Sequence, residues 1–81
     1  MLNVYVRTQV KVAGGRVDMV VLMPDTIYVM ELKVGESAQQ ALDQIDARGY
    51  ATPYRTDGRR VVEVGIRFDI DKFTVAEWQI K

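Results

Sequence analysis

The sequence predicts an α/β domain built on one mixed five-stranded sheet, with the element order β-β-β-α-β-β. Five segments carry the β pattern of alternating or continuously apolar residues, and one segment between the third and fourth shows the 3.6-residue period of a helix. A strand, a helix and a second strand in succession make a crossover unit with parallel strands, which explains the mixed sheet. Because 81 residues cannot support two cores, residues 1–81 are expected to form one domain.

The first two strands are predicted to form an antiparallel hairpin. Apolar side chains fall on even positions from Leu2 to Val12, and a second β-rich run extends from Arg16 to Met23. Between them, Ala13-Gly14-Gly15 supplies residues that tolerate the positive φ of a tight turn. After the turn at Pro24-Asp25, the run from Thr26 to Val34 is almost continuously apolar until Glu31, so we expect a central strand that is buried on both faces.

The helix is predicted over about 11 residues after Ser37. Ser37 and Gln40 have the spacing of a capping box, and Gly49 suits the position after the last turn. Its apolar residues share one stripe, at Ala38, Ala41, Leu42 and Ile45. The segment 51–59 is expected to be a loop because it holds Pro53, Asp57 and Gly58.

The last two strands, Arg60 to Phe68 and Phe73 to Ile80, are expected to pair through the turn at residues 69–72, with Trp78 directed to the core side. The sequence supplies only one helix to cover a sheet whose central strands are apolar on both faces. The second face therefore needs a cover. Either a preceding helix is missing from the N-terminus, or two chains pack together as a homodimer, or a partner domain covers the face.

Composition excludes several classes of function. The chain has no Cys and no His, which removes disulfides, thiol nucleophiles, Cys/His zinc sites and Ser-His-Asp mechanisms. Lys and Arg balance Asp and Glu at 11 each, so contact with nucleic acid must be local. No apolar run is long enough for a membrane helix and no signal pattern is visible, so we expect a cytoplasmic protein without membrane contact.

Three ionisable residues interrupt the apolar β runs: Asp18, Glu31 and Lys33. Glu31 and Lys33 are two positions apart and project to the same face, and Asp18 on the neighbouring antiparallel strand can reach the same spot. Two carboxylates and an ammonium suit Mg²⁺ or Mn²⁺ and the hydrolysis of a phosphodiester. The alternative is a strand-end ion pair, since a Glu-x-Lys triplet occurs by chance in roughly one chain in four of this length.

Several motifs in order resemble the PD-(D/E)XK nuclease superfamily, and in particular its domain that often follows an ATPase-like domain in bacterial proteins. The chain has Gly15-Arg16-Val17-Asp18, then Glu31-Leu32-Lys33, Gln44-Ile45, the run 49–54 (GYATPY) and Trp78. Val17 replaces the proline of the signature. The resemblance implies a restriction-endonuclease-like fold with strand order 1-2-3-4-5, although the family's first helix has no counterpart before Met1.

The resemblance also implies the roles of the site residues. Asp18 and Glu31 are expected to bind Mg²⁺ or Mn²⁺, Lys33 to be the catalytic lysine, and Gln44 to orient Lys33 or to contact the substrate. The expected activity is hydrolysis of nucleic acid, with DNA the expected substrate. A non-catalytic interaction or dimerisation module with the same fold is the alternative, and a binding domain without catalysis is disfavoured by the zero net charge.

Other residues carry weaker signals. Tyr50 and Tyr54 are expected to pack the helix end rather than to stack on a base. Four arginines near the loop are candidates for phosphate contacts, although charge-balanced surfaces usually carry such residues: Arg48, Arg55, Arg59 and Arg60.

Overall fold

The computed structural model describes residues 4–81 and confirms the predicted order of elements. The elements are β1 (Tyr5–Val12), β2 (Gly15–Leu22), β3 (Thr26–Val34), α1 (Ala38–Arg48), a 3₁₀ turn (Thr52–Tyr54), β4 (Arg60–Asp69) and β5 (Thr74–Ile80). They form one sheet in the order β1-β2-β3-β4-β5, in which β3 and β4 are parallel and the other neighbours antiparallel. The predicted start of the first strand at Leu2 lies outside the described residues.

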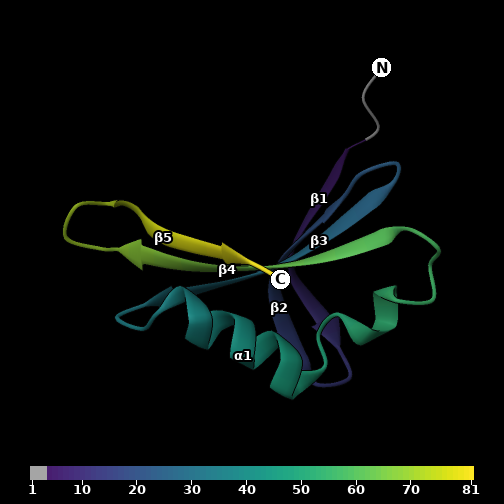
Figure 1. Cartoon of the computed structure of the whole chain (residues 1–81), viewed down its shortest axis with the longest axis horizontal. Helices are drawn as coiled ribbons and strands as arrows, with labels where there is room; N and C mark the ends of the chain where they lie inside the picture. Colours follow the sequence, from purple (N-terminus) through teal and green to yellow (C-terminus); the bar gives the residue numbers. More distant parts are fainter. Residues whose placement is uncertain (1–3) are drawn as a thin grey trace.

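The helix packs on one side of the twisted sheet, below it in Figure 1. Its start is the predicted capping box: the Ser37 hydroxyl accepts from the Gln40 N–H at 3.1 Å, and the Gln40 side chain accepts from the Ser37 N–H at 2.7 Å. Gly49 ends it in the left-handed conformation at φ 63°. The predicted stripe is buried, and Leu42 and Ile45 join a core cluster with Val20 and Val29 of the sheet.

A close approach of backbones fixes the helix on β4. A Cβ atom at Gly65 would lie 2.2 Å from the carbonyl oxygen of Ala38, so only glycine fits beneath the first turn of α1. The first turn of α1 therefore packs directly on the backbone of β4, which fixes the distance between the helix and the residues of β3 and β4 that face it.

The β1–β2 hairpin bends away from β3. β1 pairs with β2 along nearly its whole length, whereas β2 pairs with β3 only from Met19 to Leu22. At the bend, Gln9 has a positive φ of 52°, which is rare for a residue other than glycine. The tip then reaches the C-terminal end of α1, where a Cβ at Gly14 would lie 1.9 Å from the carbonyl oxygen of Arg48. β2 and β3 thus separate at Asp18.

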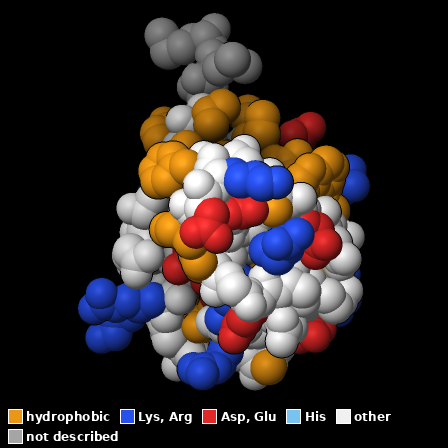
Figure 2. Space-filling model, turned by 90° about the vertical axis from the view of Figure 1, so that its left-hand side faces the viewer, with side chains coloured by type: hydrophobic (Ala, Val, Ile, Leu, Met, Phe, Trp, Pro, Cys, Tyr) orange, Lys and Arg blue, Asp and Glu red, His pale blue; other side chains and the backbone are white. Residues whose placement is uncertain are grey.

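The side of the sheet away from α1 is called the open face. In the register of β2 to β5, its positions hold one charged residue, Arg60 at the start of β4, and are otherwise uncharged: Met19, Val21, Thr26, Tyr28, Met30, Leu32, Val34, Val62, Val64, Ile66, Phe68, Val75, Trp78 and Ile80. Figure 2 shows hydrophobic side chains gathered at the top of the molecule, on this side. Several of them are exposed, including Leu32 at 42% and Ile80 at 56%. Within residues 4–81 no helix covers this face.

The prediction that Trp78 points to the core side is wrong. Trp78 pairs with Ile66 across β4 and β5, which places it on the open face, and its side chain is 63% exposed. The residues of β5 that face α1 are instead Glu77 and Gln79, opposite Arg67 and Gly65. Among the described residues, no helix is long and apolar enough to cross a membrane.

Candidate active site

Asp18 lies where β2 and β3 separate. Its Oδ2 accepts a hydrogen bond from the backbone N–H of Leu32 at 2.9 Å, and Gln9 Nε2 lies 3.5 Å from Oδ1. Burial on its own would raise the pKa of Asp18, but hydrogen bonds from Glu31, from the Leu32 N–H and from Gln9 outweigh it and lower that pKa. The Asp18 carboxylate is therefore kept ionised at the end of the paired region.

Glu31 faces α1 from β3 and is almost completely buried, with 3% of its surface exposed. Burial raises the pKa of Glu31 to about 8, and the neighbouring Asp18 carboxyl adds to this rise through a hydrogen bond and through charge repulsion. A second cation besides Lys33 would relieve this repulsion. The two carboxyl groups therefore form one acidic pair whose negative charge Lys33 compensates only in part.

Lys33 and Gln44 complete the cluster. The Gln44 side chain spans from α1 to β3: its Oε1 accepts from Lys33 Nζ, and its Nε2 donates to Glu31 Oε2 at 3.0 Å. Lys33 Nζ also lies 3.5 Å from Glu36 Oε2. The structure thus brings all four residues singled out in the sequence into one hydrogen-bonded group, and Gln44 fixes the positions of Lys33 and Glu31 relative to each other.

The donor set fits a hard divalent cation. Asp18 and Glu31 offer carboxylate oxygens, which Mg²⁺ and Mn²⁺ prefer, and Mg²⁺ commonly binds through one or two carboxylates while keeping several waters. Within residues 4–81 no third His, Cys, Asp or Glu joins these two as a metal ligand. A small cavity of about 130 Å³ adjoins the acidic pair. It is lined by Asp18, Met19, Met30, Glu31, Leu32 and Ile66.

A second charged cluster was not foreseen from the sequence. Glu63 on β4 is 3% exposed, its Oε2 lies 2.6 Å from Arg55 Nη2, and its Oε1 has no hydrogen-bond partner among residues 4–81. Burial and the facing Asp46 raise the pKa of Glu63, while Asp46 bonds Lys81. The position of Glu63 between Val62 and Val64 in an apolar strand was the available signal.

Three of the other candidates, Tyr50, Arg55 and Arg59, have partners within the described residues. Tyr50 is buried beside Gly15, at 3% exposure, as the packing interpretation predicted. Arg55 pairs with Glu63, and Arg59 pairs with Asp57 at 2.8 Å, so two of the four arginines considered for phosphate contacts have carboxylate partners.

Fold and site together define a restriction-endonuclease-like α/β domain with an acidic pair, a lysine and a glutamine on the α1 side of the sheet. The chain belongs to the PD-(D/E)XK nuclease superfamily, whose family model matches residues 1–78. It is also similar to a protein of Azotobacter chroococcum mcd 1 described as an uncharacterized protein in the vnfD 5' region, with 35% identity over 82 residues. That match covers 99% of this chain and 16% of the relative's length, and no solved structure matches.

Proposed function

We propose that this domain is a Mg²⁺- or Mn²⁺-dependent nuclease that hydrolyses phosphodiester bonds in nucleic acid, with DNA as the expected substrate. The observation that carries the proposal is the single hydrogen-bonded group in which Gln44 links Lys33 to Glu31, with the Asp18 carboxylate beside Glu31. Membership of a nuclease superfamily supports the same chemistry. A purely structural ion pair does not require a second carboxylate whose pKa is raised by burial.

In this proposal Asp18 and Glu31 hold the cation, which supplies positive charge to the phosphate when it is bound. Lys33 has a cationic Nζ near the acidic pair, where it orients the attacking water and offsets the negative charge that grows on the phosphate oxygens. Gln44 occupies one of the hydrogen-bonding directions of Nζ and so aims the ammonium. Lys33 acts directly, whereas Gln44 is a positioning residue.

The test is isothermal titration of Mn²⁺ and Mg²⁺ into the wild type and the double variant Asp18→Ala, Glu31→Ala, at fixed salt and at pH 8. We expect binding by the wild type only. Asp43→Asn is the matched control, because Asp43 is an exposed carboxylate on α1 that contacts Gln39. Equal binding by both variants and the wild type would contradict the proposed site, and circular dichroism confirms that each protein is folded.

A second candidate function is supported by the open face. A sheet face that contacts solvent normally carries many polar side chains. The open face instead carries Arg60 as its one charged residue, and its large apolar side chains Trp78 and Ile80 are exposed. We infer an interaction module in which a second copy of the chain covers this face. Light scattering after size-exclusion chromatography tests it: a dimer in the wild type and a monomer for Trp78→Lys support it, and a wild-type monomer at micromolar concentration contradicts it.

A further inference from the structure

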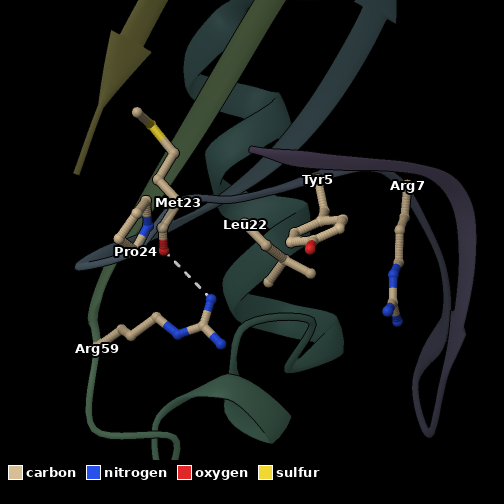
Figure 3. A pocket seen from close by; sticks show the side chains of 6 residues that line it. All are labelled: Tyr5, Arg7, Leu22, Met23, Pro24 and Arg59. Carbon is tan, nitrogen blue, oxygen red and sulfur yellow. Dashed lines mark hydrogen bonds between the residues drawn. The ribbon is translucent and has the colours of Figure 1, made fainter. Parts of the chain in front are cut away.

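A larger cavity lies at the other end of the strands from the acidic pair. Its volume is about 380 Å³, and it is lined by Tyr5, Arg7, Leu22, Met23, Pro24 and Arg59. Figure 3 shows the guanidinium groups of Arg59 and Arg7 on the two sides of this space, with the Tyr5 ring over Leu22 between them. Two strands and the loop before β4 thus contribute one wall each, and both cations border the same opening.

The two arginines differ in how they are held. Arg59 donates from Nη1 to the carbonyl oxygen of Met23 at 3.2 Å and from Nε toward Asp57 at 2.8 Å, which uses two of its five N–H donors and leaves Nη2 free within residues 4–81. Arg7 is exposed and has no ion pair or side-chain hydrogen bond within the described residues. Asp57 neutralises one of the two charges, so the cavity keeps one uncompensated positive charge and several unused donors.

The cavity is connected to the acidic pair along β1. Tyr5 and Arg7 pair with Leu22 and Val20 of β2, and Gln9, two residues further, contacts Asp18. Tyr5 and Arg7 share one face of β1, about 7 Å apart, and Gln9, at the bend that follows, extends this row to Asp18 through its own contact. Unpaired guanidinium N–H groups match the oxygens of a phosphate, and an exposed aromatic ring can stack on a base.

We propose that this cavity binds a phosphate of the same nucleic-acid strand whose scissile bond lies at Asp18 and Glu31. Arg7 and Arg59 contact the phosphate oxygens, and Tyr5, whose side chain is 61% exposed, stacks on the adjoining base. The cavity then sets the register of the strand in the site. The proposal rests on the proposed nuclease function for the choice of a polynucleotide, but binding itself requires neither metal nor cleavage.

The experiment measures binding without cleavage. A 5′-fluorescein-labelled single-stranded DNA of 12 nucleotides is titrated with the full chain carrying Glu31→Gln, in EDTA, and fluorescence anisotropy is followed at several salt concentrations. We expect Arg7→Ala to weaken binding about tenfold at low salt and to reduce the slope of log K against log salt by about 0.7, the value for one lost phosphate contact. Arg7→Lys should retain the slope and lose part of the affinity.

Lys72→Ala is the matched control, because Lys72 carries an exposed charge in the turn between β4 and β5, at the opposite edge of the sheet. Equal losses for Arg7→Ala and Lys72→Ala would mean that only overall charge is sensed, and would overturn the proposal. Arg59→Ala is tested with a thermal unfolding curve, because it also removes the bond to Met23. Arg7→Ala removes no hydrogen bond within the described residues, so its effect on binding can be interpreted without a stability control.

A second readout separates a strand from free phosphate. The side-chain Nε–H signals of Arg7 and Arg59 are followed by NMR during titration with inorganic phosphate and with the oligonucleotide. Shifts of both signals at lower concentrations of the oligonucleotide support the proposal, and equal affinity for inorganic phosphate contradicts it. If Arg7→Ala weakens binding while the wild type never cleaves, the nuclease proposal fails and the cavity stands. If the wild type cleaves DNA and Arg7→Ala binds the oligonucleotide normally, the nuclease proposal stands and the cavity proposal fails.

Discussion

Gln44 Nε2 lies 3.0 Å from Glu31 Oε2, and the same amide group accepts from Lys33 through its oxygen. One side chain of α1 thus ties an acidic and a basic group of β3, two residues apart, into a fixed arrangement. Because an amide carries both a donor and an acceptor, glutamine serves both neighbours at once, whereas a carboxylate or an ammonium at position 44 would repel one of them.

Removing Lys33 should abolish most of the catalysis without unfolding the chain. Lys33→Ala is expected to lower the cleavage rate by a factor of about 10² to 10⁴, the range for loss of a positioned proton-transfer or charge-stabilising group. Rates are measured on a labelled DNA with Mg²⁺, beside Lys72→Ala as a control for charge. An unchanged rate for Lys33→Ala in a cleaving wild type would assign Lys33 to a strand-end ion pair.

Gln44 should act on the reaction through its two partners. We expect Gln44→Ala to lower kcat about 10- to 100-fold with little change in KM, because supporting residues around a metal site commonly contribute that much. Gln44→Glu places a further carboxyl group beside Glu31 and so raises the pKa of Glu31 further. The pH profile of cleavage should therefore shift to higher pH. A merely structural role for Gln44 would lower stability and leave the pH profile unchanged.

Glu31 should make the metal-free domain less stable as pH rises. The pKa of Glu31 is about 8 in the folded state and near 4.5 in the unfolded state, so the folded state holds one more proton between these values. Its contribution to stability is complete below pH 4.5 and is lost as pH approaches 8. The expected slope in mid-range is about 1.4 kcal/mol per pH unit.

Urea unfolding in EDTA at pH 5, 6, 7 and 8 measures this slope. Glu31→Gln resembles the protonated side chain and should reduce the slope to the part that Glu63, whose pKa is also raised, contributes, so that this variant is more stable than the wild type at pH 8. Addition of Mg²⁺ at pH 8 should stabilise the wild type and leave Glu31→Gln unchanged. A wild type without any slope would show that Glu31 titrates as an ordinary exposed carboxyl group.

Gly65 should tolerate no side chain. Gly65→Ala places a methyl group 2.2 Å from the Ala38 carbonyl oxygen, so α1 must move away from β4. We expect a loss of about 1–3 kcal/mol in the free energy of unfolding, the usual range for overpacking. The same movement should shift Gln44, so cleavage should fall as well. Chemical denaturation and the cleavage assay together check this, and unchanged stability would contradict the close packing.

The sequence was sufficient for the strands, the helix cap and the convergence of Asp18, Glu31 and Lys33, because these depend on local periodicity and on adjacent strands. It was not sufficient for Trp78, since its face depends on the register of β5, which has a shift near Arg67 and Phe68. The cluster of Glu63, Arg55 and Asp46 was also not predicted, because these residues meet only when α1 and the loop before β4 pack against the sheet.

For the candidate site, too, the sequence predicted the residues but not the contacts that depend on tertiary packing. Gln44 was named through the family resemblance, while its simultaneous contacts to Glu31 and Lys33 appear only when α1 is docked on β3. The bend that brings Gly14 to Arg48, and with it the separation of β2 from β3, has no signature in the hydrophobic pattern. Positive φ at Gln9 is a property of the tertiary structure, because glutamine carries no preference for it.

The hydrogen bond from the Leu32 N–H to Asp18 has an evolutionary consequence. Where β2 leaves β3, this carboxylate replaces the β2 backbone partner of Leu32, so Asp18 supports the backbone as well as the proposed chemistry. Glu31 likewise accepts from the backbone N–H of Asp18, whereas Lys33 contacts only the side chains of Gln44 and Glu36. In descendants that have lost catalysis, the two carboxyl residues should therefore be retained longer than the lysine, because both also support the backbone where β2 and β3 separate.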